Sequence, residues 1–343
     1  MDRQLDSMIK NDLVEEANSP WAAPILLIDK KDGTKRLVVD FRRLNRIKRK
    51  DRYSIPNVTE TLDSLGKAKI FTTLDLAAGY WQVEVKEEDR DKTAFITARG
   101  QFRFKVLPFG LCNAPSTFRR IMDHKLRGLL DKNFLVYLDD IIIYSETSED
   151  HLVHLRHVLE RLRKANLKLK PEKCYIGRRR VKYLDHVVSE TGVKPAPEYI
   201  NKVLQFVEPT DKKSLKLFLG MICYYMKFIP GYSQLAHPLI KLTHEKQAFE
   251  WGQEQSKSFQ ILKKLLREEP ILKYPDFHKE FNLATDASNV AIGVVLGQLD
   301  ELGKEHPVAY ASQVLNKVES NYSTKERSTI DVQDGKAFSR VFT

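Results

Sequence analysis

The chain has 343 residues, more than a single compact core usually holds, so two or three core units are expected. Its hydrophobic content of 42% and charged content of 30% are typical of a folded globular protein and exclude a disordered one. Lysine and arginine total 57 against 46 acidic residues, and this net charge of +11 favours a polyanionic partner, although a solvated basic surface would give the same excess.

The first predicted elements are a helix and a hairpin. Apolar residues recur at helical spacing over residues 4–16 and predict one helix there. Residues 25–28 are apolar and predict a strand, and residues 37–41 predict the strand that returns beside it. Between them, residues 30–34 contain Asp-Gly, which supplies the backbone angles of a tight turn. These segments therefore predict a β-hairpin.

The middle of the chain alternates strand and helix patterns. Residues 70–75 predict a strand, and residues 134–144 predict two strands with a pair of aspartates at the turn between them. An amphipathic helix is predicted for residues 149–167, with its apolar face at Leu152, Leu155, Leu159 and Leu162.

The last third of the chain changes character twice. A further strand is predicted at residues 181–189. Residues 211–269 are basic and predict a mostly helical region. A new unit rich in strands is predicted to begin near Phe281.

Cysteine usage and apolar runs bear on the compartment. The three cysteines, at 112, 174 and 223, are widely separated and predict neither a disulfide framework nor a zinc knuckle, so a reducing compartment is expected. The first residues have no basic-then-apolar signal pattern, and no apolar run has membrane-spanning length. We therefore expect an intracellular protein that is not secreted and has no membrane partner.

Two adjacent carboxylates, Asp139 and Asp140, are the first chemical signal. They repel each other unless a cation lies between them. An Asp-Asp pair alone is weak evidence, because such pairs are common in turns. Here apolar residues flank the pair on both sides, so a buried hairpin would carry a charged tip, and buried carboxylates need a metal or a cationic partner.

Asp75 is a second candidate metal ligand, because it also ends an apolar strand. The small residues Ala77, Ala78 and Gly79 follow it and allow backbone N–H groups to approach a phosphate closely. Hard carboxylate oxygens suit Mg²⁺. Two such ions can activate an attacking hydroxyl and stabilise the leaving oxygen in nucleotidyl transfer.

Taken together, the motifs resemble the reverse transcriptases of gypsy-type LTR retrotransposon Pol polyproteins. Tyr-Leu-Asp-Asp at 137–140, Leu-Asp at 74–75 and the segment 107–118 resemble the three central motifs of the family and occur in its order. Three further segments resemble the fingers of gypsy-type enzymes: 19–24, 30–33 and 39–45. The resemblance covers residues 5 to 327, nearly the whole chain, and six ordered motifs are a specific signal.

The resemblance implies an α+β right-hand polymerase with fingers, palm and thumb, followed by a helical connection and a partial RNase H-like α/β unit. It places fingers and palm in residues 1–190, the mostly helical thumb and connection in 191–277 and the incomplete RNase H-like domain in 278–343. The implied setting is a cytoplasmic virus-like particle or the nucleus.

The implied activity is RNA- or DNA-templated DNA synthesis from a primer, with dNTPs as substrates. The alternative is a degenerate, non-catalytic protein that derives from such an element and binds nucleic acid. The oligomeric state is left open.

The resemblance also implies a role for each matching residue of the metal site. Asp75 and Asp139 would ligate two Mg²⁺ ions, with help from the carbonyl of Leu76. Asp140 would complete the acidic cluster, more as support than as a direct ligand.

A second set of matching residues would bind the incoming nucleotide. Lys30 and Arg36 would grip its triphosphate, although without the resemblance they are ordinary surface charges. Tyr80 would block a ribose 2′-hydroxyl, although without the resemblance it is a core tyrosine. The backbone N–H groups of Ala78 and Gly79 would hold the β- and γ-phosphates. Phe109 and Gly110 would border the nucleotide and template.

Two features outside the polymerase motifs carry alternatives. Tyr-Leu-Asp-His at 183–186 resembles the primer-grip hairpin of the family, with Asp185 where glycine is expected, and its carboxylate would repel primer phosphate. His151, His154 and His157 recur on one predicted helix, where a soluble helix face is favoured over a zinc site.

The C-terminal segment resembles the start of RNase H. Asp286 stands where the family has its first metal carboxylate, whereas Ser328 stands at the expected glutamate and Glu326 is out of register. From Ser328 onward the resemblance is lost, and the third and fourth carboxylates are not found. We therefore expect no RNase H activity in this chain.

Overall fold

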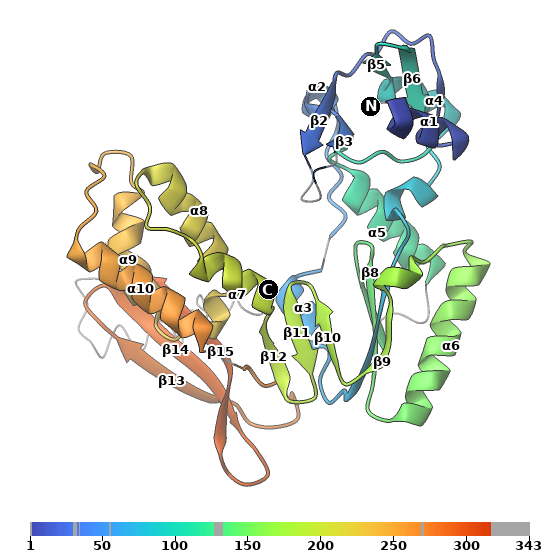
Figure 1. Ribbon diagram of the computed structural model, residues 1–343. Coiled ribbons are helices and arrows are strands. Elements are labelled where there is room, and N and C mark those ends of the chain that lie inside the picture. Colours follow the sequence, from blue (N-terminus) through green and yellow to red (C-terminus); the bar gives the residue numbers. More distant parts are fainter. Residues whose placement is uncertain are drawn as a thin grey trace. The chain divides into compact units, whose positions relative to one another are not determined.

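A computed structural model describes residues 2–29, 33, 35–54, 56–126, 133–268 and 271–316 (Figure 1). The chain forms two compact units that alternate along the sequence. Unit 1 comprises the described parts of Met1–Pro56, Thr72–Ile143 and Ser148–Ile176. Unit 2 comprises those of Asn57–Phe71, Tyr144–Thr147 and Gly177–Thr343.

The N-terminal part of unit 1 combines a helix with a small sheet around one core. Helix α1 (Asp2–Lys10) lies near an antiparallel sheet of order β1-β6-β5, and β2 pairs with β3 as a separate hairpin. Leu5 and Met8 of α1 are buried with a group of aromatic side chains: Phe41, Phe95, Phe102 and Phe104. The elements of this part are β1 (Val14–Glu16), β2 (Ile25–Asp29), β3 (Lys35–Val39), α2 (Arg42–Ile47), α4 (Glu87–Arg90), β5 (Phe95–Thr97) and β6 (Gly100–Phe104).

The single helix predicted for residues 4–16 is wrong in its second half. Helix α1 ends at Lys10 because Asp12 takes a left-handed conformation, with φ of 57°, and Leu13 N–H donates back to the Met8 carbonyl. Val14 then begins β1 and pairs with Phe104 of β6. The predicted β-hairpin is confirmed by β2 and β3, whereas its turn residues 30–32 and 34 lie outside the described residues.

A four-stranded sheet of order β7-β8-β4-β9 carries the aspartates. Its strands β8 and β9 are labelled in Figure 1. Its strands are β4 (Ile70–Asp75), β7 (Phe134–Tyr137), β8 (Asp140–Ser145) and β9 (Tyr175–Arg178). The predicted strand at 70–75 and the predicted pair of strands over 134–144 are therefore confirmed. Side chains of α5 (Ala114–Lys125) and α6 (Ser148–Lys164) join the core beside this sheet, including Phe118, Met122, Val158 and Leu162.

Helix α6 confirms the predicted amphipathic helix, but only half of the predicted apolar face lies inside. Leu162 is buried and Leu155 packs against the core, whereas Leu152 and Leu159 are exposed. His151 and Val158 are buried in their place. His151 lies inside because its Nε2 is 2.7 Å from Thr72 Oγ1 of β4, so a hydrogen bond compensates the burial of the ring. Burial, and then the charge of His154, lowers the pKa of His151.

Unit 2 begins with a short helix and a three-stranded sheet. The order is β10 (Arg180–Tyr183), β11 (His186–Ser189) and β12 (Gly192–Pro195), and α3 spans Val58–Asp63. The single strand predicted at 181–189 is wrong, because Leu184 and Asp185 both have positive φ and turn the chain into a hairpin.

Helices and a second sheet complete unit 2. The helical region predicted for 211–269 is confirmed by α8 (Lys212–Cys223), α9 (Tyr232–Leu242) and α10 (Gln253–Arg267), which follow α7 (Pro197–Leu204). The strand-rich unit predicted from Phe281 is confirmed by β13 (Asn282–Ala287), β14 (Ala291–Leu299) and β15 (Glu305–Val314), and α9 contacts β14 and β15 (Figure 1). No described helix has the length and apolarity needed to cross a membrane.

Candidate active site

Three aspartates meet where β4 and the β7–β8 hairpin end. Asp75 is the last residue of β4, and Asp140 is the first of β8, paired with Tyr137. Asp139 lies in the turn, which Leu138 makes possible with a φ of 56°, and its carbonyl accepts a 3.3 Å hydrogen bond from Leu76 N–H. The strands hold these ends rigidly because the side chains behind them are fully buried, notably Ile141.

One lysine offsets part of the negative charge of the three aspartates. Lys173 Nζ lies 2.9 Å from Asp75 Oδ2. The hydrogen bond to Asp75, and then the charges of Asp140 and Asp139, raises the pKa of Lys173. The charges of all three carboxylates thus favour the protonated form of the Lys173 ammonium group.

The donors at this end of the sheet are of the hard oxygen type. Three carboxylates and the Leu76 carbonyl suit a divalent ion such as Mg²⁺ in their chemistry. Among the residues that the structure describes, no three or more His, Cys, Asp or Glu side chains are arranged to hold a metal ion.

The chain turns sharply after Asp75. Ala78 has φ of 51° and ψ of 47°, a left-handed conformation that costs a non-glycine residue about 1 kcal/mol, and it caps the short helix η1 (Gly79–Gln82). A Cβ on Gly79 would lie 3.0 Å from the Asp139 Cβ and 3.4 Å from Phe118 Cζ. Glycine at this position is what allows η1 to approach the Asp139 side of the cluster so closely.

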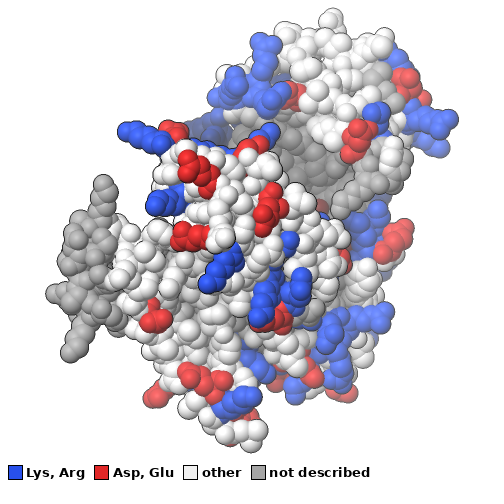
Figure 2. Space-filling model, turned by 60° about the vertical axis from the view of Figure 1, so that its left-hand side comes forward, with Lys and Arg blue, Asp and Glu red and all other residues white. Residues whose placement is uncertain are grey.

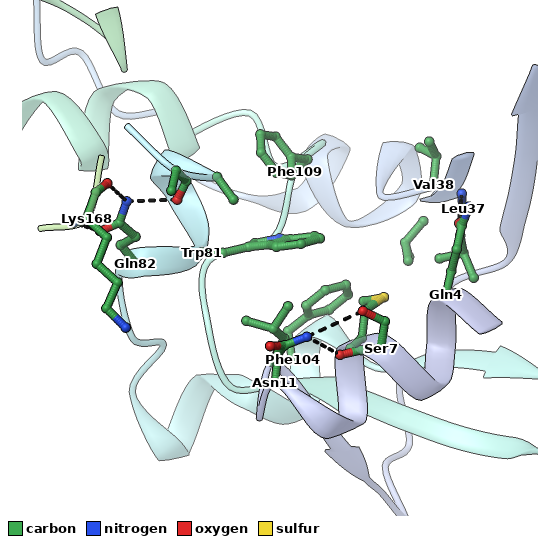
Figure 3. Close-up of a pocket in the computed structure, with 15 residues that line it drawn as sticks. Gln4, Ser7, Asn11, Leu37, Val38, Trp81, Gln82, Phe104, Phe109 and Lys168 are labelled. Carbon is green, nitrogen blue, oxygen red and sulfur yellow. Dashed lines mark hydrogen bonds between the residues drawn. The ribbon is translucent and has the colours of Figure 1, made fainter. Parts of the chain in front are cut away.

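Gln82 holds that turn in place (Figure 3). Its Nε2 donates to the carbonyls of Ala77, at 2.8 Å, and Lys168, at 2.9 Å. Its Oε1 accepts from Lys168 N–H at 2.7 Å. The side chain thus ties the segment after Asp75 to a segment 86 residues later, and no pattern in the sequence indicated this role.

Aromatic rings fix the side chain of Tyr80. Its ring centroid lies 5.1 Å from that of Phe109 and 5.3 Å from that of Phe118. Burial, and then the charge of Asp139, raises the pKa of Tyr80. Gly110, next to Phe109, has φ of 93°, and Asn45 Nδ2 donates to its carbonyl at 2.8 Å.

A cavity of about 670 Å³ opens beside these residues (Figure 3). Its walls come from α1, β3, η1 and the Phe109 segment, and include Gln4, Leu37, Val38, Ala78, Trp81 and Phe109. The structure therefore brings Ala78 and Phe109 to one cavity, next to the turn that carries Gly79 and Tyr80.

The remaining predicted residues are less fully described. Lys30 and the side chain of Arg36 lie outside the described residues, although the backbone of Arg36 pairs with Ile28 in the β2–β3 hairpin. Asp286 is exposed on β13 in unit 2, paired with Gly293. Glu326 and Ser328 lie outside the described residues.

Asp185 occupies a position whose geometry favours glycine. Its φ is 55°, and aspartate is among the few other residues that tolerate this left-handed region. Its carbonyl accepts hydrogen bonds from Ala196 N–H, at 3.0 Å, and Tyr225 Oη, at 2.7 Å. The neighbouring His186 is buried, and burial above all, followed by the charge of Lys227, lowers its pKa to about 3.

Comparisons with known proteins identify two domains in the chain. Residues 28–188 match the family described as reverse transcriptase (RNA-dependent DNA polymerase), and residues 251–333 match the RNase H-like domain found in reverse transcriptase. Similar curated proteins include the retrovirus-related Pol polyproteins from transposons opus (43% identical) and 297 (41%) of Drosophila melanogaster, and the transposon Tf2-3 polyprotein of Schizosaccharomyces pombe (35%). Each alignment covers 97% of this chain but only 25–35% of the relative.

Solved structures support the expected fold. Two foamy viral protease-reverse transcriptase structures, both in complex with double-stranded DNA, align over 99% of this chain. One has a TM-score of 0.89 at 24% identity and is covered over 59% of its length; the other has 0.87 at 25% and 70%. The right-hand polymerase fold with an RNase H-like unit is thereby confirmed. The chain therefore belongs to the reverse transcriptase family, as a segment related to the Pol polyproteins of retrotransposons.

Proposed function

We propose that this chain catalyses RNA- or DNA-templated DNA synthesis from a primer, with dNTPs as substrates. The observation that carries the proposal is the convergence of Asp75, Asp139 and Asp140 at one end of the sheet, beside the turn after Asp75 and the cavity. We assign fingers and palm to residues 1–190, thumb and connection to 191–277 and an incomplete RNase H-like domain to 278–343. The activity would take place inside the cell, in a cytoplasmic virus-like particle or the nucleus.

Divalent metal ions serve the reverse transcriptase family, and we propose two Mg²⁺ ions here. Asp75 and Asp139 would hold them with the Leu76 carbonyl, and Asp140 would support the cluster. Such ions activate an attacking hydroxyl and stabilise the leaving oxygen. Lys173 balances the same carboxylates through its contact with Asp75.

For the nucleotide we propose one set of contacts around the turn. The N–H groups of Ala78 and Gly79 would hold the phosphates, and Tyr80 would lie against the sugar. The fingers would contribute Lys30 and Arg36, and Phe109 and Gly110 would border the nucleotide and template.

A primer-extension assay tests the proposal. With an RNA template, a DNA primer, dNTPs and Mg²⁺, the chain is expected to lengthen the primer, and omission of Mg²⁺ should stop synthesis. Binding of the template-primer without any extension would favour the alternative, a non-catalytic nucleic-acid-binding protein.

Replacing Gln82 by leucine is expected to lower kcat strongly. The variant loses three hydrogen bonds, each worth about 1 kcal/mol, and keeps the backbone bonds from Ala77 N–H to the Lys168 carbonyl and from Lys170 N–H to the Asp75 carbonyl. The turn after Asp75 is therefore held less firmly, and the catalytic geometry is populated less. We expect a fall in kcat of roughly 10- to 100-fold, measured as single-turnover extension at saturating dNTP. Gln82→Glu keeps only the acceptor for Lys168 N–H, so its kcat should lie between those of wild type and Gln82→Leu. An unchanged kcat in both variants would show that Gln82 does not support the site.

Asp185 is the observation that favours the non-catalytic alternative, and it can be tested directly. Asp185→Gly keeps the carbonyl that accepts from Ala196 and Tyr225, relieves the left-handed backbone and removes a negative charge from the hairpin. We expect template-primer binding to tighten by roughly threefold. Asp185→Asn separates the two causes, since it removes the charge and retains the side chain; weaker binding in both variants would contradict the expectation.

Binding of template-primer is expected to weaken steeply with salt. Five exposed basic side chains follow one another around α2: Arg43, Arg46, Arg49, Lys50 and Arg52. Figure 2 shows Lys and Arg interspersed with Asp and Glu on the face drawn, so local clusters such as this one, more than net charge, would displace counterions. Arg46→Ala with Arg49→Ala should reduce the slope of log Kd against log salt by about 2. A flat wild-type plot would argue against a polyanionic partner.

A further inference from the structure

The β2–β3 hairpin has little core of its own. Leu26, Leu27 and Ile28 of β2 are 47%, 43% and 51% exposed. A two-stranded hairpin is marginally stable in water unless something else supports it. The support at its base is clear, because Asp40 N–H donates to the Pro24 carbonyl at 2.8 Å. The part nearer to Lys35 needs another attachment.

Gln4 of α1 provides that attachment. Leu37 N–H donates to Gln4 Oε1 at 2.8 Å, and Gln4 Nε2 donates to the Lys35 carbonyl. Backbone groups of residues two apart on a strand point to the same edge, so one side-chain amide satisfies both, as a single residue of a third strand would. Arg36, between them, directs its backbone groups to the other edge, where it is paired with Ile28.

Helix α1, which carries Gln4, is anchored in the core of unit 1. Leu5 is 0% and Met8 7% exposed, and both belong to the core cluster that also contains Val39, the last residue of β3. Asp6 forms an ion pair with Arg99 on the other side of α1. Gln4 therefore connects a fixed helix to an otherwise weakly supported strand, and it lines the cavity beside Leu37 (Figure 3).

We propose that Gln4 is a positioning residue for the incoming nucleotide: its amide holds the backbone of β3, the strand to which Arg36 belongs. The inference rests on the proposed function, since the nucleotide contact of Arg36 belongs to that proposal. It adds a determinant of nucleotide affinity that lies on α1, outside the motifs of the site.

The test combines hydrogen exchange with nucleotide binding. Gln4→Met keeps the length of the side chain and removes both hydrogen bonds. Exchange at the Leu37 amide is expected to become faster by about tenfold, and Kd for dATP, measured on a template-primer complex without turnover, should rise by about three- to tenfold. The kcat at saturating dNTP should stay within about twofold, because the clamp acts on affinity. Gln4→Glu, which keeps the acceptor for Leu37 N–H, should restore part of the protection.

Gln101→Met is the matched control. Gln101 clamps another backbone segment with the same chemistry: Oε1 accepts from Ser19 N–H at 2.7 Å, and Nε2 donates to the carbonyls of Ser19 and Trp21. It is expected to lower Tm as much as Gln4→Met does, with no change at Leu37 and no change in Kd for dATP.

Unchanged exchange at Leu37 in Gln4→Met would overturn the clamp, and faster exchange with unchanged Kd would overturn its role in nucleotide binding. Equal changes of Kd for dATP in Gln4→Met and Gln101→Met would also overturn the role in nucleotide binding, because a general loss of stability would then explain both. If the wild-type chain extended no primer, the proposed function would fail. Hydrogen exchange at the Leu37 amide and the Kd for dATP would still decide this inference.

Discussion

Asp139→Asn is expected to abolish primer extension, with a loss of several orders of magnitude in the single-turnover rate. Asparagine has nearly the same volume as aspartate, so the close approach of Gly79, whose added Cβ would lie 3.0 Å from the Asp139 Cβ, is preserved. What is lost is the anionic oxygen that we propose as a metal ligand, and a neutral amide cannot stabilise the ions that act in the transition state.

The measurement must separate chemistry from binding and folding. Kd for template-primer and Tm should stay close to wild type, because the β7–β8 turn is held by the backbone bond from Leu76 to the Asp139 carbonyl. Asp12→Asn is a suitable control, since Asp12 is an exposed aspartate of the same unit that pairs with Lys105. Extension by Asp139→Asn at the wild-type rate would refute the proposed metal site.

Tyr80→Ala is expected to weaken discrimination against ribonucleotides by at least about tenfold in the ratio of kcat/KM values. The ring is held by Phe109 and Phe118, so it cannot move aside to admit a 2′-hydroxyl. Removing the ring opens space beside the sugar. The kcat/KM for rNTP should therefore rise relative to the kcat/KM for dNTP.

Tyr80→Phe is the decisive control. If discrimination depends on the shape of the ring, the Tyr80→Phe variant retains it, because only the hydroxyl is lost. The ratio for dATP against ATP, measured on one template for wild type and both variants, gives the answer. No change of the ratio in Tyr80→Ala would leave Tyr80 as a core residue that packs between two phenylalanines.

The meeting of the three aspartates at one end of the sheet was predictable because local pattern and position coincide. Asp75 and the pair at 139–140 each end an apolar run, and such runs form buried strands whose ends must lie at an edge of the sheet. The resemblance to the family then supplied what the pattern alone left open, namely that the two strand ends meet.

The supporting contacts were not predictable, because each joins segments far apart in the chain. The bonds of Gln82 to Lys168 and of Lys173 to Asp75 span 86 and 98 residues, and neither glutamine nor lysine has a local signature for such a role. The same cause explains why part of the buried face of α6 was mispredicted: Thr72 of β4 offers a hydrogen-bond partner to His151, which is therefore buried.

The interleaving of the two units dictates the order in which the chain can fold during synthesis. Unit 1 is complete once Ile176 has left the ribosome, whereas unit 2 waits for the chain beyond Gly177 although its first segment, Asn57–Phe71, emerged long before. That early segment carries side chains that are buried in the folded protein: Leu62, Leu65, Ala68 and Phe71. A fragment that stops near Ile176 lacks the rest of unit 2 from Gly177 onward, so this segment has no complete unit in which to pack. Such a fragment is therefore expected to aggregate or to require a chaperone, even though it contains all three aspartates of the proposed catalytic site.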